Sequence, residues 1–138
     1  MRSKQLSDDT YVLVFDQGDE AMAELQRFAE HHEHGAARFT GIGVSAVTLG
    51  YFEHERIGYR PIPLEEQVEL LSIVGDVAEG KPKVHAHVVV GRSDGSAHGG
   101  HLLEGHVWPT LELFLTVLPA HLQKRSDSKT GLALIDLD

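Results

Sequence analysis

The chain has 138 residues, of which 41% are hydrophobic and 24% are charged, a composition typical of one folded domain. Its formal net charge is −9, from 12 Lys and Arg against 21 Asp and Glu, which argues against nucleic-acid binding because that activity depends on basic residues that neutralise phosphates. Cys is absent, so disulfides and thiolate ligands are excluded, and any metal must be held by His or carboxylates.

The first ten residues, MRSKQLSDDT, lack the apolar segment of a signal peptide, and nowhere do about 18 apolar residues follow one another. Together with the absence of Cys, these features predict a cytoplasmic protein that is not anchored in a membrane. The ten His residues are many for this length, and they are the first indication of a specific chemistry.

The N-terminal part predicts a strand followed by a helix. Residues 11–15, YVLVF, form a short apolar run that is typical of a buried strand. Asp19 suits an N-cap, and the helix should end near His34, before Gly35. Its buried face is predicted from apolar residues at helical spacing, namely Met22, Leu25, Phe28 and Ala29.

Three His residues lie in the last turn of that predicted helix: His31, His32 and His34. Positive charge at a helix C-terminus complements the helix dipole, and this is the interpretation that we favour. A second metal site is the alternative, because His31 and His34 are three residues apart on one face, although no third ligand is evident.

The middle of the chain predicts strands at 37–43, 44–53 and 67–75, the first two joined or bent at Gly41–Gly43. Residues 54–63 are polar with two Pro, so they predict a loop or an irregular edge, and 76–82 predict a turn.

Towards the C-terminus, Pro109 and Pro119 bracket a run in which Leu111, Leu113, Leu115 and Val117 alternate with other residues. Alternation favours a strand, although a helix is possible because Leu and Glu are good helix formers. Residues 120–130 predict a polar loop and 131–137 a last short strand. The whole chain, 1–138, is therefore predicted to be one α+β domain with a core at about 11–136, a largely antiparallel sheet of seven or eight strands and one main helix.

The stretch Lys83–Gly105 predicts a β-hairpin with chemistry on one face. Side chains alternate along a strand, so His85 and His87 point to the same side. A turn at Ser93-Asp94-Gly95 brings His101 back roughly level with that pair. His98 is a rival third ligand, but it lies three residues earlier and belongs to the opposite face unless the intervening glycines form a bulge.

Three imidazoles from one hairpin indicate a metal site with an open position, most suitably for Zn²⁺, although Ni²⁺, Cu²⁺ or Fe²⁺ would also fit. Gly99 and Gly100 carry no side chain that could block the approach. The alternative is that His85, His87 and His101 are ordinary half-buried polar residues.

The motifs spread over the chain also support a resemblance. They lie between Tyr11 and about Asp136 and comprise Gly41-x-Gly43, Leu49-Gly50-Tyr51-Phe52, Glu69-Leu70-Leu71 with Ser72 and Gly75, His85-x-His87, Gly99-Gly100-His101, Gly105 and Thr110-x-Glu112. With these residues the chain resembles the PPC domain, which occurs in plants and prokaryotes. The resemblance implies a compact α/β domain that assembles as a homotrimer.

Plant members of the resembled family carry AT-hook motifs and bind DNA in the nucleus, and prokaryotic members carry a DNA-binding label by analogy. This chain contains no Arg-Gly-Arg-Pro sequence. The layout of His85, His87 and Gly99-Gly100-His101 is also similar to the zinc site of acetolactate decarboxylases, in which three His hold the metal, although the hairpin connection here is a little longer.

Three functions follow from these observations. The first is a metal-binding PPC protein with a small-molecule or regulatory role. The second is a metal-dependent lyase acting on a keto or hydroxy acid, with Glu112, Glu69 or Arg125 as acid, base or carboxylate clamp, unless these residues are simple ion pairs or strand-edge charges. The third is a DNA-associated protein, which the charge disfavours.

Overall fold

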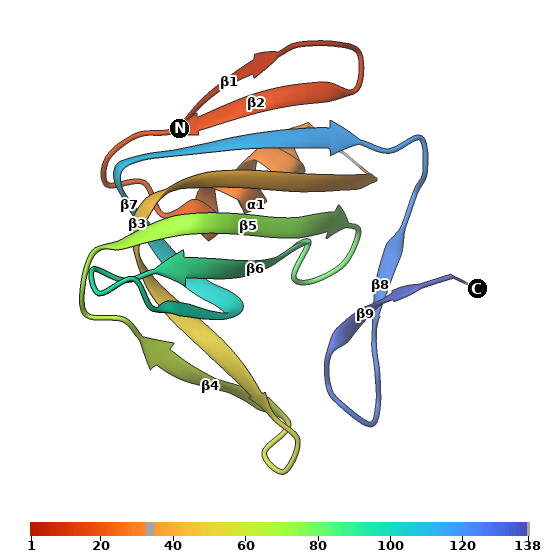
Figure 1. Ribbon diagram of the computed structural model, residues 1–138. Coiled ribbons are helices and arrows are strands. Elements are labelled where there is room, and N and C mark those ends of the chain that lie inside the picture. The colour runs from red at the N-terminus through yellow and green to blue at the C-terminus, as the bar shows by residue number, and fades with distance from the viewer. Residues whose placement is uncertain (33–34, 138) are drawn as a thin grey trace.

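The computed structural model describes residues 1–32 and 35–137, and most of these form one antiparallel sheet of seven strands (Figure 1). The sheet contains β1 (Arg2–Gln5), β2 (Thr10–Phe15), β3 (Ala36–Glu53), β4 (Gly58–Pro63), β5 (Val68–Ala78), β6 (Val84–Gly91) and β7 (Ala97–Val117). One helix, α1 (Ala21–His31), packs against it, and β8 (Gln123–Ser126) and β9 (Ala133–Asp136) form a separate ribbon. The predicted α+β class is confirmed.

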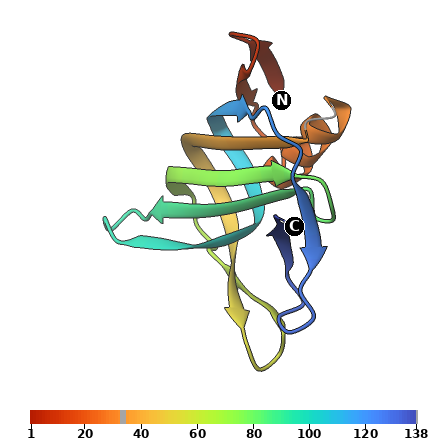
Figure 2. The same ribbon diagram turned by 90° about the vertical axis from the view of Figure 1, so that its right-hand side faces the viewer.

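Four strands of the sheet close into a ring. β3 pairs with β5 along one edge and with β7 along the other, β5 pairs with β6, and β6 pairs with the first residues of β7. β7 is long enough to run from β6 across to β3, and Figure 2 shows the resulting curl of the sheet. β2 extends the sheet from the far half of β7, and β4 pairs with the end of β3.

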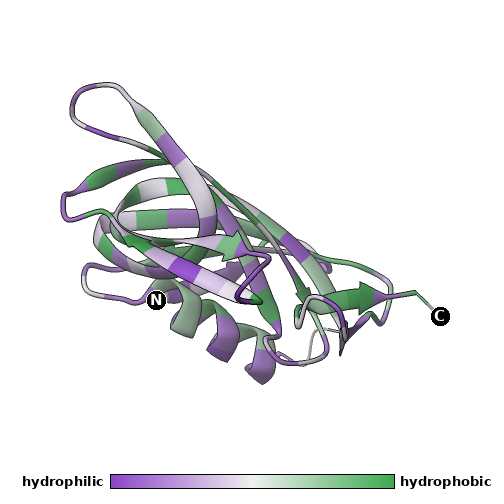
Figure 3. Cartoon of the chain, turned by 90° about the horizontal axis from the view of Figure 1, so that it is seen from below, coloured by the Kyte–Doolittle hydropathy of each residue, from purple (hydrophilic) through white to green (hydrophobic). Residues whose placement is uncertain are grey.

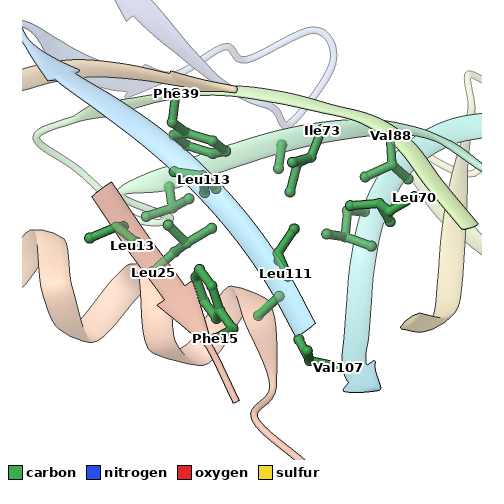
Figure 4. Packing of buried hydrophobic residues seen from close by; sticks show 14 of the residues in the cluster. Leu13, Phe15, Leu25, Phe39, Leu70, Ile73, Val88, Val107, Leu111 and Leu113 are labelled. Carbon is green, nitrogen blue, oxygen red and sulfur yellow. The ribbon is translucent and has the colours of Figure 1, made fainter. Parts of the chain in front are cut away.

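The core lies inside this curl and beneath α1. Alternate residues of β7, Leu111, Leu113 and Leu115, are buried there, as are alternate residues of β6 from Val84 to Val90 (Figure 4). Burying one such side chain contributes about 1.5–3 kcal/mol to stability. Bands of opposite hydropathy alternate along the strands (Figure 3). This burial holds the register of β6 and β7, so their remaining side chains are fixed on the outer face.

The helix starts one residue later than predicted, because the N-cap is Glu20 rather than Asp19. The Glu20 carboxylate accepts hydrogen bonds from the backbone N–H groups of Met22 and Ala23, at 3.2 and 2.7 Å, and also from Gly105 on β7 at 2.9 Å. Asp19 instead contacts the N-terminal ammonium group at 2.7 Å. The helix ends at His31. The helix was predicted to end near His34, which is also the partner of His31 in the alternative metal site, and His34 lies outside the described part of the chain.

Several predicted boundaries were wrong because pairing partners distant in sequence decide where strands run. The segments predicted at 37–43 and 44–53 are one strand, with a shift of register between Gly41 and Gly43. The predicted loop at 54–63 contains the edge strand β4, the predicted turn at 76–82 begins inside β5, and the predicted loop at 120–130 contains β8. β1 was not predicted. Within the described residues, no helix is both long and apolar enough to span a membrane.

Candidate metal centre

The predicted hairpin is present, and its register places the three His side by side. His87 on β6 lies directly opposite His101 on β7, and His85 is two residues from His87 on the same outer face. His101 also pairs with Gly50 of β3. It is therefore the residue of β7 at which the pairing with β6 ends and the pairing with β3 begins. A Cβ added at Gly100 would lie 3.2 Å from the Gly50 carbonyl oxygen, so the absence of a side chain there permits this close crossing.

The three imidazoles face one another at close range. Ring centroids are 5.0 Å apart for His85 and His87, 5.0 Å for His85 and His101, and 5.4 Å for His87 and His101. One nitrogen from each ring lies within 4.8 Å of the others. Two ligand nitrogens on one tetrahedral Zn²⁺ are about 3.3 Å apart, so small rotations of the rings bring this donor set around one ion.

The electrostatics favour neutral imidazoles, the form that binds metals. Burial, followed by the proximity of His85 and His87, lowers the pKa of His101 to about 4. Burial and then His85 also lower the pKa of His87. In addition, Nδ1 of His101 is buried and has no hydrogen-bond partner within the described chain. A buried polar atom without a hydrogen-bond partner destabilises the fold. A bond from Nδ1 of His101 to a metal ion is among the contacts that would provide the missing partner.

The carboxylate of Asp76 lies beside one member of the His cluster, His85. Asp76 on β5 lies opposite His85 in the register, and its Oδ2 is 3.6 Å from Nδ1 of His85. Burial acts to raise the pKa of Asp76, but the nearby His85 and Lys124 side chains outweigh it and hold this pKa below its usual value. A carboxylate that accepts a hydrogen bond from one ring nitrogen fixes the orientation of a metal-binding His and leaves its other nitrogen free. At 3.6 Å, Asp76 lies just beyond hydrogen-bond distance of His85.

The C-terminal ribbon reaches this carboxylate through Lys124 on β8. Its Nζ lies 2.8 Å from Oδ1 of Asp76 and donates a hydrogen bond to the carbonyl oxygen of Lys83 at 3.1 Å, and its side chain is only 2% exposed. A buried ammonium group without a partner would be strongly destabilising, so this pair fixes the ribbon against β5 and β6.

A cavity of 630 Å³ adjoins the His cluster. It opens onto His85 and His101 and is bounded by Tyr59 of β4, by Asp76 and by the ribbon. The Tyr59 ring stacks on His101 with centroids 4.1 Å apart and planes inclined by 16°. Cavities of this size are typical of small-molecule sites.

The other predicted site residues lie elsewhere. His98 is opposite Val90, whose side chain points into the core, and the pairing from His87 to Gly91 is regular, so His98 belongs to the face away from the cluster. Glu69 is opposite Gly91, at the far end of β6 from His85.

Neither of the remaining two candidates lines the cavity. Glu112 is opposite Ile42 on β3 and Val14 on β2, in a part of β7 remote from the residues that pair with β6. Arg125 is on the ribbon, with its Nε 2.5 Å from Oδ2 of Asp136. The structure therefore brings the three His together, and it leaves Glu69, Glu112 and Arg125 outside the described lining of the cavity.

Three residues of the site were missed by sequence reasoning. Asp76 could have been found by placing β5 beside β6, since it falls directly opposite His85. Tyr59 lies in a stretch predicted as a loop, and Lys124 belongs to a segment predicted to be polar and irregular. No local signal in the sequence distinguishes these two from ordinary surface residues.

Comparison with known proteins gives the family. The model of the Plants and Prokaryotes Conserved (PCC) domain, the domain also abbreviated PPC, matches residues 2–119. The chain belongs to this family. The PCC domain thus covers all seven strands of the main sheet and the three His, whereas the ribbon lies beyond the matched residues. No curated protein matches the chain.

Solved structures agree with the PCC assignment. A PPC protein from Pyrococcus horikoshii is 33% identical, with a TM-score of 0.82 over 92% of this chain and 90% of the other. A metal-containing protein from Archaeoglobus fulgidus is 29% identical, with a TM-score of 0.80 over 91% of each chain. A candidate DNA-binding protein from Bacteroides thetaiotaomicron is 25% identical, with a TM-score of 0.90 over 98% of this chain and 96% of the other.

Proposed function

We propose that this PCC protein binds one divalent transition-metal ion through His85, His87 and His101, and that the ion holds a small molecule in the adjoining cavity. The observation that carries the proposal is the convergence of one nitrogen from each ring to within 4.8 Å of the others. Imidazole-only ligation suits Zn²⁺ best, and Ni²⁺, Cu²⁺ or Fe²⁺ would compete for the same ligands. The similarity to a metal-containing protein from Archaeoglobus fulgidus supports the proposal.

When bound, a divalent ion supplies a Lewis acid that polarises or holds an oxygen ligand. The chain's own residues prepare that site. Burial and the neighbouring rings keep the His101 imidazole neutral at physiological pH, and Asp76 orients His85. The ribbon and Tyr59 bound the space in which the small molecule is held.

Zinc titration by calorimetry tests this function. Protein stripped with EDTA should bind one Zn²⁺ per chain, and His87→Ala should abolish that stoichiometric binding. His98→Ala is the matched control, because it removes an imidazole from the same hairpin but from the opposite face, and it should bind Zn²⁺ like the wild type. Equal zinc binding by wild type and His87→Ala would contradict the proposal.

A metal-dependent lyase acting on a keto or hydroxy acid is the second candidate, supported by the cavity that opens onto His85 and His101. Glu69, Glu112 and Arg125 lie outside that cavity, so Tyr59 becomes the better candidate for a proton donor to substrate. Burial raises the pKa of Tyr59, which keeps its hydroxyl protonated. Turnover of a panel of 2-keto acids by zinc-loaded protein, and its loss in Tyr59→Phe, would support this activity.

For DNA the proposal is weak or absent binding. Structures from Bacteroides thetaiotaomicron and Ralstonia eutropha that resemble this chain are described as candidate DNA-binding proteins. The net charge of −9 opposes that activity here. Fluorescence anisotropy with a random duplex at physiological salt should give a dissociation constant weaker than about 10⁻⁶ M. A tighter, salt-sensitive affinity would restore the DNA-associated alternative.

For self-association the proposal is a homotrimer. An apolar row crosses the outer face of the sheet, where Phe114 on β7 and Val74 on β5 flank the same residue of β3, Thr40. These side chains are 51% and 50% exposed, and Ile42 beside them is 63% exposed. Contiguous exposed apolar side chains mark association surfaces, and covering this face by other copies of the chain would remove it from water.

A further inference from the structure

The cavity beside the His cluster has two different ends. One end is polar and carries four lining residues that lie next to one another, namely His85, His101, Asp76 and Lys124. The remaining lining is mostly apolar and is contributed by β3, β4 and the turn between them, by Pro82, and by residues 132–135 of the ribbon, with Phe52, Ile57 and Leu134 among its members. The ribbon is held in this position by the buried Lys124, so the apolar wall is a built part of the structure.

The charge of the lining is opposite to that of the protein. Among the charged residues that line the cavity there are two Lys, Lys81 and Lys124, and one carboxylate, Asp76. The pairing of Lys124 with Asp76 at 2.8 Å leaves Lys81 uncompensated within the lining. The chain as a whole has a net charge of −9. A divalent ion on three neutral imidazoles would add two further positive charges, so the cavity attracts an anion.

We infer that the cavity binds a small carboxylic acid with a branched or aromatic hydrocarbon body. The carboxylate lies at the polar end, towards His85 and His101, and the hydrocarbon body lies against Leu134 and its neighbours on the ribbon. The volume of 630 Å³ accommodates such a molecule. Inorganic phosphate or a sugar would leave the apolar wall without a partner. The inference rests on the proposed metal site, which supplies most of the positive charge.

The test is a calorimetric titration of zinc-loaded protein with phenylacetate, acetate and the neutral phenylacetamide, after the metal content of the same sample has been measured. Each buried methylene is worth about fourfold in affinity, so phenylacetate should bind at least about tenfold more tightly than acetate. Loss of the negative charge should make phenylacetamide at least about tenfold weaker than phenylacetate.

Matched variants separate the two ends of the cavity. Leu134→Ser should weaken phenylacetate about fivefold, roughly the effect of one or two buried methylenes, while acetate and zinc binding stay the same. Leu137→Ser is its control, since Leu137 is 85% exposed and lies outside this cavity. Lys81→Gln should weaken both acids alike, and Lys129→Gln, outside the lining, should weaken neither.

The possible outcomes distinguish a failure of the carboxylic-acid inference from a failure of the proposed metal site. Full zinc occupancy with no preference for phenylacetate over acetate, or with equal binding of phenylacetamide, would overturn the inference and leave the metal site standing. A zinc-free sample after loading would overturn both, and the metal measurement shows this independently of any acid. Selective binding of phenylacetate that Leu134→Ser reduces about fivefold, and Leu137→Ser leaves unchanged, would establish the inference.

Discussion

Protonation of His101 should destabilise the metal-free protein in acid. Burial, and then the proximity of His85 and His87, lowers the pKa of His101 to about 4, whereas His in an unfolded chain has a pKa of about 6.5. Because the folded pKa is the lower one, the unfolded chain binds more protons. The resulting contribution to stability is fully present above about pH 6.5 and is lost as the pH falls towards about 4.

The magnitude follows from the two pKa values. Their difference of about 2.5 corresponds to about 3.5 kcal/mol, at about 1.4 kcal/mol for each pKa unit. The His101 ring is only partly buried, so water screens part of the effect and we expect about 2 kcal/mol. This is a large share of the stability of a small domain, which is about 5–15 kcal/mol.

The assay is urea unfolding in EDTA at pH 7.5 and pH 4.5. Between these conditions the wild type should lose about 2 kcal/mol more of its free energy of unfolding than His101→Gln, whose side chain does not titrate. His98→Gln, on the opposite face of the same hairpin, should lose as much as the wild type. Equal losses in wild type and His101→Gln would refute the reasoning.

Three further results are expected. Asp76→Asn should weaken zinc binding about 10–100-fold, because the carboxylate beside His85 orients that ring. The change also removes the ion pair of the buried Lys124, so circular dichroism must first show that the variant is folded; an unchanged calorimetric affinity would remove Asp76 from the site. Gly75→Ala should destabilise the fold by at least about 2 kcal/mol, since the added Cβ would clash with the His85 carbonyl oxygen. Gly58→Ala, whose nearest neighbour would be 3.9 Å away, should leave the urea midpoint unchanged. Light scattering should give a trimer that Phe114→Asp dissociates, and a monomeric wild type at micromolar concentration would contradict this.

The hairpin was predictable from sequence because its signals are local. β-branched residues at alternate positions define β6, Asp94-Gly95 defines the turn, and strand alternation alone puts His85 and His87 on one face. The boundaries of β3 and β7 were not predictable in the same way. β3 continues through its glycines because it has paired neighbours on both sides. β7 continues past Pro109, where its register with β3 shifts, because residues before and after Pro109 both pair with β3.

The surroundings of the His cluster depended on contacts between distant parts of the chain. Asp76 meets His85 through the register of β5 and β6, and Lys124 meets Asp76 only because the ribbon folds back over the sheet. Periodicity carries no information on either contact. The carboxylates chosen from sequence, Glu69 and Glu112, were selected by residue type, and the structure places them away from the cavity.

The central claim is that His85, His87 and His101 hold one metal ion, and anomalous X-ray scattering tests it most directly. Crystals of protein purified with zinc present should be measured on both sides of the zinc absorption edge. We expect one anomalous peak per chain, bonded to a nitrogen of each of the three rings at about 2.0–2.1 Å. No peak between the three imidazoles, or a peak that persists in His101→Ala crystals, would contradict it.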